Sequence, residues 1–354
     1  MINNIIRRKS RTVKVGSVRI GGDAPVTVQS MTISKTNDVR ATLEEIRALH
    51  AAGCDIARVA VPRKEDANAL ADIVKESPLP IVADIHFNHV FALKAVEAGV
   101  AKIRINPGNI GHPDRERQVL DACKEKNIPI RIGVNSGSLE KDILDKYGFP
   151  KPEALYESAM RHVDICEKND FTDVVISVKH SSVKYMIDAY RLLAAKVDYP
   201  LHLGVTEAGT VQSGTIKSCV GIGTLLAEGI GDTIRVSLTA DSVKEVEVGK
   251  TILKSLGLTA PGINIIACPT CGRLEVDLFR IAEEVENAVK KYNKNINIAL
   301  MGCVVNGPGE AGAADLGVAC GSQRAILFRK GEVLRHLKEE EIIPALIEQI
   351  EIWK

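Results

Sequence analysis

Three cysteines near the C-terminus have the spacing of ligands for a metal or a metal cluster. Cys268 and Cys271 form a Cys-x-x-Cys turn, and Cys303 opens a second motif that runs through Asn306 to Glu310. The turn lets two thiolates hold one centre, and the third thiol reaches it from a separate loop. Three soft sulfur ligands and one hard carboxylate oxygen suit a 4Fe–4S cluster with one exchangeable iron.

The same spacing occurs in structural zinc sites, for which Cys320 offers a fourth thiol. Cys320 lies in a short apolar run typical of a buried strand, where a free cysteine acts as a small hydrophobic residue. Spacing alone leaves zinc and an iron–sulfur cluster open as alternatives. The remaining cysteines lie in apolar, helix-like contexts, and we expect all four to be packing residues: Cys54, Cys123, Cys166 and Cys219.

Composition and charge exclude several classes of function. The chain has 354 residues, of which 45% are hydrophobic and 26% charged, and a net charge of +1. This charge gives no reason to expect binding to nucleic acid or to a membrane surface, and no apolar run is long enough for a membrane helix. Eight cysteines without an export signal indicate a cytoplasmic protein that uses thiols for metal or redox chemistry.

The first part of the chain repeats a unit of one short β-branched run and one amphipathic helical stretch. Glycines such as Gly53, Gly99 and Gly229 fall where these helices would end. Eight such units in about 230 residues predict a TIM (β/α)8 barrel, and an open doubly wound sheet is the main competing fold. The expected strands are Val26–Thr32, Ile56–Pro62, Pro80–His86, Lys102–Gly108, Ile128–Asn135, Asp173–Lys179, Leu201–Glu207 and Thr233–Thr239.

Polar residues recur with a period of two near the C-terminal ends of these strands, and the active site of a TIM barrel is built at that end. Their alternates, such as Ile103, Ile132 and Val178, should pack outward on the helices. The polar side chains expected at the mouth are Arg58, Asp84, His86, Arg104, Asn106, Arg131, Asn135, Ser177, Lys179, Glu207, Arg235 and Ser237.

Five cations at one mouth would outnumber the two carboxylates, Asp84 and Glu207. A ring of internal salt bridges is the alternative interpretation, but unpaired buried charge is costly. The excess positive charge therefore favours an anionic ligand, and converging guanidinium groups suit phosphate oxygens. Four glycines after the seventh strand could add backbone amides to a diphosphate site: Gly209, Gly214, Gly221 and Gly223.

The pattern changes near Pro261, which predicts a barrel domain over 1–258 and a second domain over 259–354. The second domain is expected to be a small α+β module that carries the cysteine motifs on the turns after two strands. Its expected strands and helices are Ile263–Ala267, Leu274–Tyr292, Ile296–Met301, Leu316–Ala319, Ala325–Phe328 and Glu339–Ile352.

With these motifs in view, the chain resembles the 4-hydroxy-3-methylbut-2-enyl diphosphate synthases of the methylerythritol phosphate route to isoprenoids. The resemblance covers nearly the whole chain, from the run Val-Thr-Val-Gln-Ser-Met-Thr at Val26 to the C-terminal helix, and is to the short bacterial form. It implies reductive ring opening and dehydration of 2-C-methyl-D-erythritol 2,4-cyclodiphosphate to the allylic diphosphate.

The resemblance also implies roles for residues. Cys268, Cys271 and Cys303 would hold three irons of a 4Fe–4S cluster, with Glu310 on the fourth. Glu207 is the candidate for proton delivery or for orienting the hydroxyl that leaves as water. Asp84 and His86 would be orienting groups, and Asn306 could hydrogen-bond the cluster sulfurs or Glu310. The cyclic diphosphate would be bound by Arg58, Arg104, Asn106, Arg131, Asn135, Lys179, Arg235 and Ser237.

The implied partners are flavodoxin or ferredoxin as electron donor and a second copy of the chain. In the family, the barrel of one subunit pairs with the cluster domain of the other in a homodimer. One competing hypothesis is a zinc-stabilised TIM-barrel transferase of the pterin-binding type, with Cys320 completing the zinc site. The other is a noncatalytic iron–sulfur sensor that binds nucleic acid, which the net charge disfavours.

Overall fold

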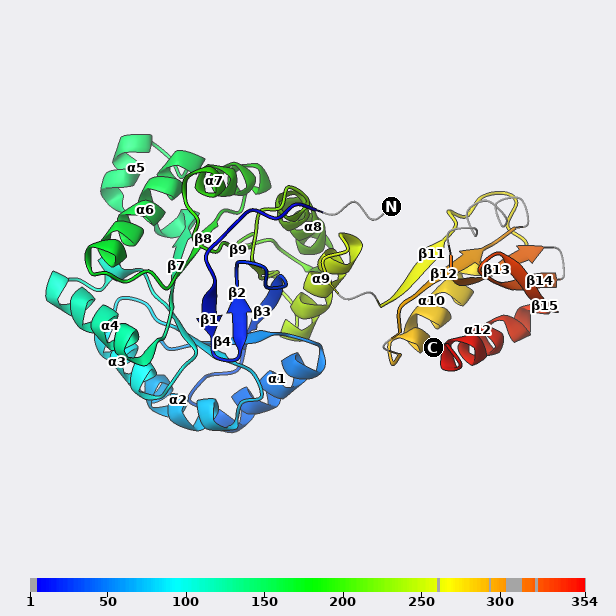
Figure 1. The fold of residues 1–354 in the computed structure, drawn as a ribbon, viewed down its shortest axis with the longest axis horizontal. Helices are drawn as coiled ribbons and strands as arrows, with labels where there is room; N and C mark the ends of the chain where they lie inside the picture. Colours follow the sequence, from blue (N-terminus) through cyan, green and yellow to red (C-terminus); the bar gives the residue numbers. More distant parts are fainter. Residues whose placement is uncertain (1–4, 260–261, 293, 304–313, 322–323, 354) are drawn as a thin grey trace. The chain divides into compact units, whose positions relative to one another are not determined.

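The computed structural model describes residues 5–259, 262–292, 294–303, 314–321 and 324–353. The chain divides into two compact units, Met1–Thr259 and Ala260–Lys354. The first is a barrel of parallel strands surrounded by helices, and the second is a small sheet with helices on one face (Figure 1).

All eight predicted barrel strands are present, although several are shorter than expected. They lie in the order β8-β7-β6-β5-β4-β3-β10-β9, and a parallel bridge between Ile176 and Leu201 closes the ring. The predicted TIM barrel is therefore confirmed. The strands are β3 (Thr27–Met31), β4 (Ile56–Ala60), β5 (Ile81–Asp84), β6 (Lys102–Arg104), β7 (Ile130–Asn135), β8 (Val174–Lys179), β9 (His202–Leu203) and β10 (Thr233–Ile234).

The helices of the barrel begin and end at the local signals that the sequence carries. Asp38 caps the first helix by accepting a hydrogen bond from the Ala41 N–H at 3.1 Å. Gly53, Gly99 and Gly229 follow three of the helices with φ angles of 85°, 76° and 77°, which are left-handed conformations that favour glycine. The helices are α1 (Val39–Ala51), α2 (Lys64–Glu76), α3 (His89–Glu97), α4 (Pro113–Lys126), α5 (Lys141–Tyr147), α6 (Pro152–Lys168), α7 (Val183–Lys196), α8 (Val211–Ala227) and α9 (Ser242–Ser255), with short 3-10 turns η1 (Pro107–Asn109) and η2 (Ser136–Ser138).

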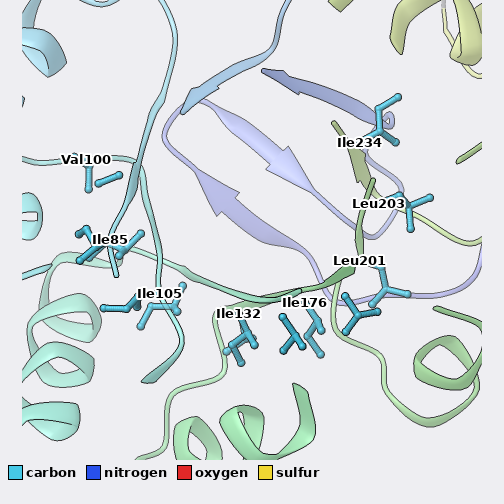
Figure 2. Packing of buried hydrophobic residues seen from close by; sticks show 14 of the residues in the cluster. Ile85, Val100, Ile105, Ile132, Ile176, Leu201, Leu203 and Ile234 are labelled. Carbon is cyan, nitrogen blue, oxygen red and sulfur yellow. The ribbon is translucent and has the colours of Figure 1, made fainter. Parts of the chain in front are cut away.

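The main core lies between the strands and the surrounding helices. Outward-facing strand residues such as Ile85, Ile105, Ile132 and Ile176 are buried there (Figure 2). The predicted outward residues Ile103, Ile132 and Val178 belong to the same cluster. The alternate residues therefore point into the barrel, so this packing fixes which polar groups face the interior.

An N-terminal hairpin that the sequence reading missed lies at the opposite end of the barrel from the strands' C-termini. Strands β1 (Val13–Val15) and β2 (Val18–Ile20) pair antiparallel. Val13, Val15 and Ile20 pack against inward-facing strand residues in a separate apolar cluster: Ile56, Val82 and Val175. This hairpin fills the base of the barrel and leaves the polar mouth at the other end.

The segment before the hairpin is hydrogen-bonded to the same end of the barrel as the hairpin. The Arg8 N–H donates to the Gly229 carbonyl at 2.9 Å. Asp232, which is 2% exposed, accepts hydrogen bonds from Arg7 Nη2 at 2.9 Å and Ser10 Oγ at 2.8 Å. Its other oxygen accepts from the Leu201 N–H, so one carboxylate joins the N-terminal segment to the strand edge.

The second unit is a five-stranded sheet in the order β11-β12-β13-β14-β15. The first three strands are parallel, and β14 and β15 add antiparallel neighbours. Both of its described α-helices pack on the same face of the sheet, which confirms the predicted α+β module. Strand β15 was not predicted, because its residues are mostly exposed. The elements are β11 (Ile263–Ala267), α10 (Leu278–Val289), β12 (Ile296–Met301), β13 (Leu316–Gly321), β14 (Arg324–Arg329), β15 (Glu332–Leu337), η4 (Glu339–Glu341) and α12 (Ile342–Glu351).

Candidate active site and candidate metal centre

A polar cavity opens at the C-terminal ends of the barrel strands. Most of the polar side chains predicted for the mouth line it, and within the described residues its lining includes five Lys or Arg side chains and one carboxylate. Asn106 and Glu207 are not among the lining residues. The lining consists of Arg58, Asp84, His86, Arg104, Arg131, Gly133, Asn135, Ser177, Lys179, Thr206, Arg235 and Ser237.

Asp84, at the end of β5, is the carboxylate that organises one side of the cavity. Its Oδ1 lies 3.2 Å from Arg104 Nη1, and its Oδ2 lies 3.8 Å from Arg58 Nε. Burial by itself would raise the pKa of Asp84, but Arg58, His86 and Arg104 together hold that pKa well below its usual range. Asp84 therefore stays ionised and fixes two guanidinium groups before any ligand enters.

Arg104 is also held from the neighbouring strand β7. Its Nη2 donates to the Gly133 carbonyl at 2.6 Å, and a Cβ at position 133 would lie 2.5 Å from Arg104 Nε. Asn106 accepts a hydrogen bond from the Gly133 N–H at 2.8 Å and donates to its carbonyl at 3.3 Å. Asn106, just beyond β6, therefore holds Gly133 on the neighbouring strand β7, and the Gly133 carbonyl is the acceptor for Arg104.

Arg235 is paired with a buried glutamate that the sequence reading missed. Glu245 on α9 lies 3.3 Å from Arg235 Nη2 and is 5% exposed. It also accepts hydrogen bonds from Ser30 Oγ at 3.0 Å and from the Leu238 N–H at 3.0 Å. A single glutamate in the first turn of a helix is usually a solvated residue, so its spacing gave no sign of this contact.

Arg131 and Lys179 are buried basic side chains that form no ion pair with the described residues. Arg131 is 1% exposed, and its Nε and Nη1 have no hydrogen-bond partner among the described residues. Burial lowers the pKa of Lys179 well below its ordinary value, and Arg235 and Arg131 lower it further. Because unpaired buried cations are unfavourable, this half of the cavity is arranged for an anion.

A further lysine lies inside the barrel and was not predicted as a site residue. Lys102, at the start of β6, is completely buried, and its Nζ has no hydrogen-bond partner within the described part of the chain. Burial lowers its pKa well below the ordinary value, and Arg131 and Arg58 add to the effect. The buried His202 on β9 shows the same behaviour, since burial and the surrounding cations lower its pKa.

Glu207 lies just beyond β9, on an exposed part of the loop at the same end of the barrel. Its φ angle is 52°, a left-handed conformation that a non-glycine residue adopts at a cost. Burial lowers the pKa of His180, and this shift is partly offset by the Pro150 backbone and by the negative charge of Glu207.

Gly214, Gly221 and Gly223 lie within α8, and the Gly214 N–H donates to the Thr210 carbonyl. The prediction that these three glycines add backbone amides to a diphosphate site was therefore wrong, because they lie inside a helix.

Three of the four cysteines of the second unit lie at or beside the carboxyl edge of its parallel strands. Cys268 directly follows β11, and Cys303 follows β12, which pairs with β11 in parallel register. The Gly302 N–H donates to Cys268 Sγ at 3.3 Å, so the two strand ends are in contact. Cys271 is exposed on the turn after Cys268. Two of the three predicted thiols therefore share one edge, and the third lies on the adjoining turn.

The described donors at this edge do not by themselves form a metal site. Within the described ranges no three His, Cys, Asp or Glu side chains lie close enough together to hold a single metal ion. Cys320 is fully buried inside β13, and burial raises the pKa of its thiol to about 12. It is a packing residue, as its apolar run predicted. Glu310 and Asn306 lie outside the described residues.

Three of the other four cysteines are buried as expected: Cys54, Cys123 and Cys166. Cys219 is exposed on α8, so the prediction that it packs in the core was wrong. Because the helix has apolar residues on more than one face, the sequence pattern did not indicate that Cys219 faces solvent. No described helix has both the length and the apolar character needed to cross a membrane.

The fold and the cavity define a class: a TIM-barrel protein with a mouth lined by basic side chains, joined to a thiol-bearing α+β module. Residues 10–250 match the family model of the GcpE TIM-barrel domain, and residues 264–352 match that of the GcpE protein C-terminal domain. The chain belongs to the GcpE family.

Curated relatives match the chain over nearly its whole length. The protein of Clostridium perfringens is 58% identical over 345 residues, which are 98% of this chain and 99% of the relative. Those of Symbiobacterium thermophilum and Geobacter sulfurreducens are 57% and 53% identical, each over 98% of this chain and over 94% and 98% of their own lengths. All three are named 4-hydroxy-3-methylbut-2-en-1-yl diphosphate synthase (flavodoxin).

Among solved structures, the HPPK-DHPS protein of Plasmodium falciparum with STZ-DHP gives a TM-score of 0.52. It is 11% identical, and the match covers 79% of this chain and 54% of that one. At this identity the likeness shows a shared barrel fold only.

Proposed function

We propose that the chain reductively opens the ring of 2-C-methyl-D-erythritol 2,4-cyclodiphosphate and removes water to give (E)-4-hydroxy-3-methylbut-2-enyl diphosphate. The observation that carries this proposal is the convergence of five cations on one cavity whose described lining includes one carboxylate. A cyclic diphosphate supplies the negative charge that this arrangement lacks. The names of the relatives support the same reaction and flavodoxin as electron donor.

The cations divide between fixed and unpaired groups, and this division assigns their roles. Arg58, Arg104 and Arg235 are already oriented by Asp84 or Glu245, so they are positioned to hold the diphosphate in one pose. Arg131 and Lys179 take their neutralising partner from the ligand. Asn135 and Ser237 lie in the same lining and add hydrogen-bonding groups. His86 lies 2.8 Å from Arg104 by its Nε2 and supports that guanidinium.

The second unit would hold a 4Fe–4S cluster through Cys268, Cys271 and Cys303, with Glu310 on the remaining iron and Asn306 beside it. Such a cluster supplies electrons one at a time and a Lewis-acidic iron for the departing oxygen. The placement of Cys268 and Cys303 on adjacent strand ends supports this set. Glu207, on the loop after β9, is the proposed proton donor to the oxygen that leaves as water.

We assign residues 1–258 to substrate binding and 259–354 to the cluster, and we propose a homodimer in which each barrel works with the cluster domain of its partner. Flavodoxin or ferredoxin would deliver the electrons. A strictly monomeric chain with full activity in solution would contradict the dimer without affecting the reaction.

The zinc-stabilised transferase of the pterin-binding type has less support. Its fourth ligand would be Cys320, which is buried within a central strand of the sheet. The two matched family models belong to a different family from that transferase.

The test is an anaerobic one. Protein supplied with iron and sulfide is examined by visible and EPR spectroscopy before and after reduction, and then with the cyclodiphosphate. A brown protein that forms the allylic diphosphate with reduced flavodoxin supports the proposal. A colourless protein with stoichiometric zinc and no turnover would overturn it.

A further inference from the structure

A buried histidine and a carboxylate hold the loop that follows β6, although neither lines the cavity. His162 on α6 is 1% exposed, and its Nδ1 accepts a hydrogen bond from the Gly108 N–H at 3.1 Å. Its Nε2 lies 3.1 Å from Oε1 of Glu140, the residue before α5. The other oxygen of Glu140 accepts a hydrogen bond from Ser158 Oγ at 2.7 Å. The β6 loop, α5 and α6 are therefore joined at one imidazole.

The backbone of the loop lies in close contact with the imidazole at Gly108. A Cβ at Gly108 would lie 3.0 Å from His162 Nδ1 and 3.2 Å from Ile165 Cδ1. A methyl group at this position would crowd the ring, so the loop or the imidazole would have to shift by a few tenths of an ångström. The contact thus depends on a glycine on one side and on an acceptor nitrogen on the other.

This loop is continuous with the groups that orient Arg104. Asn106 precedes Gly108 by two residues, and its carbonyl accepts from the Asn109 N–H at 2.9 Å across the same turn. The Asn106 side chain makes both hydrogen bonds to Gly133, whose carbonyl is the acceptor for Arg104. A shift of the turn would therefore move the amide that fixes the acceptor of a cavity guanidinium.

The tautomer of His162 follows from these contacts. Nδ1 accepts an N–H, so the ring proton must be on Nε2, the nitrogen that faces Glu140. Burial would raise the pKa of Glu140, but His162 and Ser158 lower it to about 2, so the carboxylate is ionised at neutral pH. Glu116 on α4 is a second carboxylate that interacts electrostatically with His162.

We propose that His162, oriented by Glu140, is a positioning residue for the anion site, which acts by holding the Gly108 turn and through it Asn106, Gly133 and Arg104. The inference rests on the proposed function, because it takes the ligand of the cavity to be a diphosphate. It adds residues from α5 and α6, outside the cavity lining, to the groups that set diphosphate affinity.

Two variants of His162 separate positioning from packing. In His162→Asn the side-chain oxygen falls near the former Nδ1, so an acceptor for the Gly108 N–H is kept. In His162→Gln the amide falls near the former Nε2, so the contact with Glu140 is kept and the acceptor is lost. The probe is inorganic pyrophosphate, titrated calorimetrically into the full chain, with thermal unfolding measured on each variant.

We expect His162→Gln to weaken pyrophosphate binding about five- to tenfold, because one buried hydrogen bond is lost, and His162→Asn to stay within about twofold of the wild type. Gly108→Ala attacks the same contact from the loop and should match His162→Gln even where the latter fails to fold. His112→Gln is the control, because His112 also accepts a backbone N–H but is exposed. With the cluster loaded, the loss should appear in KM more than in kcat.

Packing alone predicts that asparagine, the smaller residue, is the more damaging replacement. Equal or larger loss of affinity in His162→Asn would overturn the positioning role, as would full affinity in both His162→Gln and Gly108→Ala. If these variants bind normally while Arg104→Gln does not, only this inference fails. A wild-type chain that does not bind pyrophosphate would overturn the anion site and the inference with it.

Discussion

The barrel mouth and the cysteine edge of the second unit are built on different principles. At the mouth, the protein's own carboxylates and carbonyls orient Arg58, Arg104 and Arg235 in the free chain. At the cysteine edge, Cys268 and Cys303 are brought to adjacent strand ends, but the described residues do not form a closed set of ligands. The barrel mouth is therefore preorganised, whereas the described part of the cysteine edge brings two thiols close without a closed ligand set.

The sharpest test of this difference removes a thiol. Cys268→Ala should abolish cluster assembly and turnover, because two remaining thiols cannot hold a cubane cluster, while pyrophosphate affinity of the barrel stays unchanged. Iron and sulfide analysis with calorimetry measures both. Cys219→Ala, at an exposed thiol on α8, is the matched control and should keep the full cluster. Full iron content in Cys268→Ala would mean that the assignment of ligands is wrong.

The next effect concerns the unpaired arginine. Arg131→Met should weaken pyrophosphate binding about 10- to 100-fold. This range corresponds to the loss of charge-assisted hydrogen bonds, which contribute about 1.5–3 kcal/mol. The unfolding temperature should stay level or rise, since the change removes a buried cation whose Nε and Nη1 have no hydrogen-bond partner among the described residues. Calorimetry and thermal unfolding report the two effects separately. Loss of stability together with affinity would show that Arg131 has a partner in the free protein.

A smaller effect is expected at the support of Arg235. Glu245→Gln should lower pyrophosphate affinity about tenfold and destabilise the barrel by about 1–2 kcal/mol, because an ion pair and its hydrogen bonds to Ser30 and Leu238 are weakened. Urea unfolding and calorimetry give the two values. Glu247→Gln, two residues along α9 and exposed, should change neither. An unaffected Glu245→Gln variant would mean that Arg235 needs no orientation.

The smallest functional effect is expected inside the barrel. Lys102→Met should leave turnover nearly unchanged and raise the free energy of unfolding by about 1–2 kcal/mol at neutral pH. The pKa of Lys102 is lower in the folded than in the unfolded chain, so the unfolded chain binds the extra proton below about pH 10. The advantage of the variant should therefore shrink as the pH rises toward 10. Urea unfolding at several pH values, with Lys146→Met as an exposed control, measures this trend. An advantage that is constant with pH would mean that Lys102 is charged inside the barrel.

The sequence predicted those features that depend on periodicity within one element. The period of two placed Arg104 and Arg131 inward and Ile103 and Ile132 outward, and the barrel confirms that arrangement. Contacts between distant elements were missed, because a single residue such as Glu245 carries no sign of its partner. The hairpin β1–β2 was missed for a related reason. Its two short strands gain stability only from burial against the barrel.

That hairpin has a consequence for how the chain is made. Residues 5–22 are translated well before their partners, which include Val175, Gly229 and Asp232. The base of the barrel therefore cannot be sealed until nearly all of the barrel has been synthesised. Contacts of such long sequence separation form slowly. We expect docking of the N-terminal segment to be a late step of folding, and a nascent chain that stops before Asp232 to expose the apolar base to chaperones.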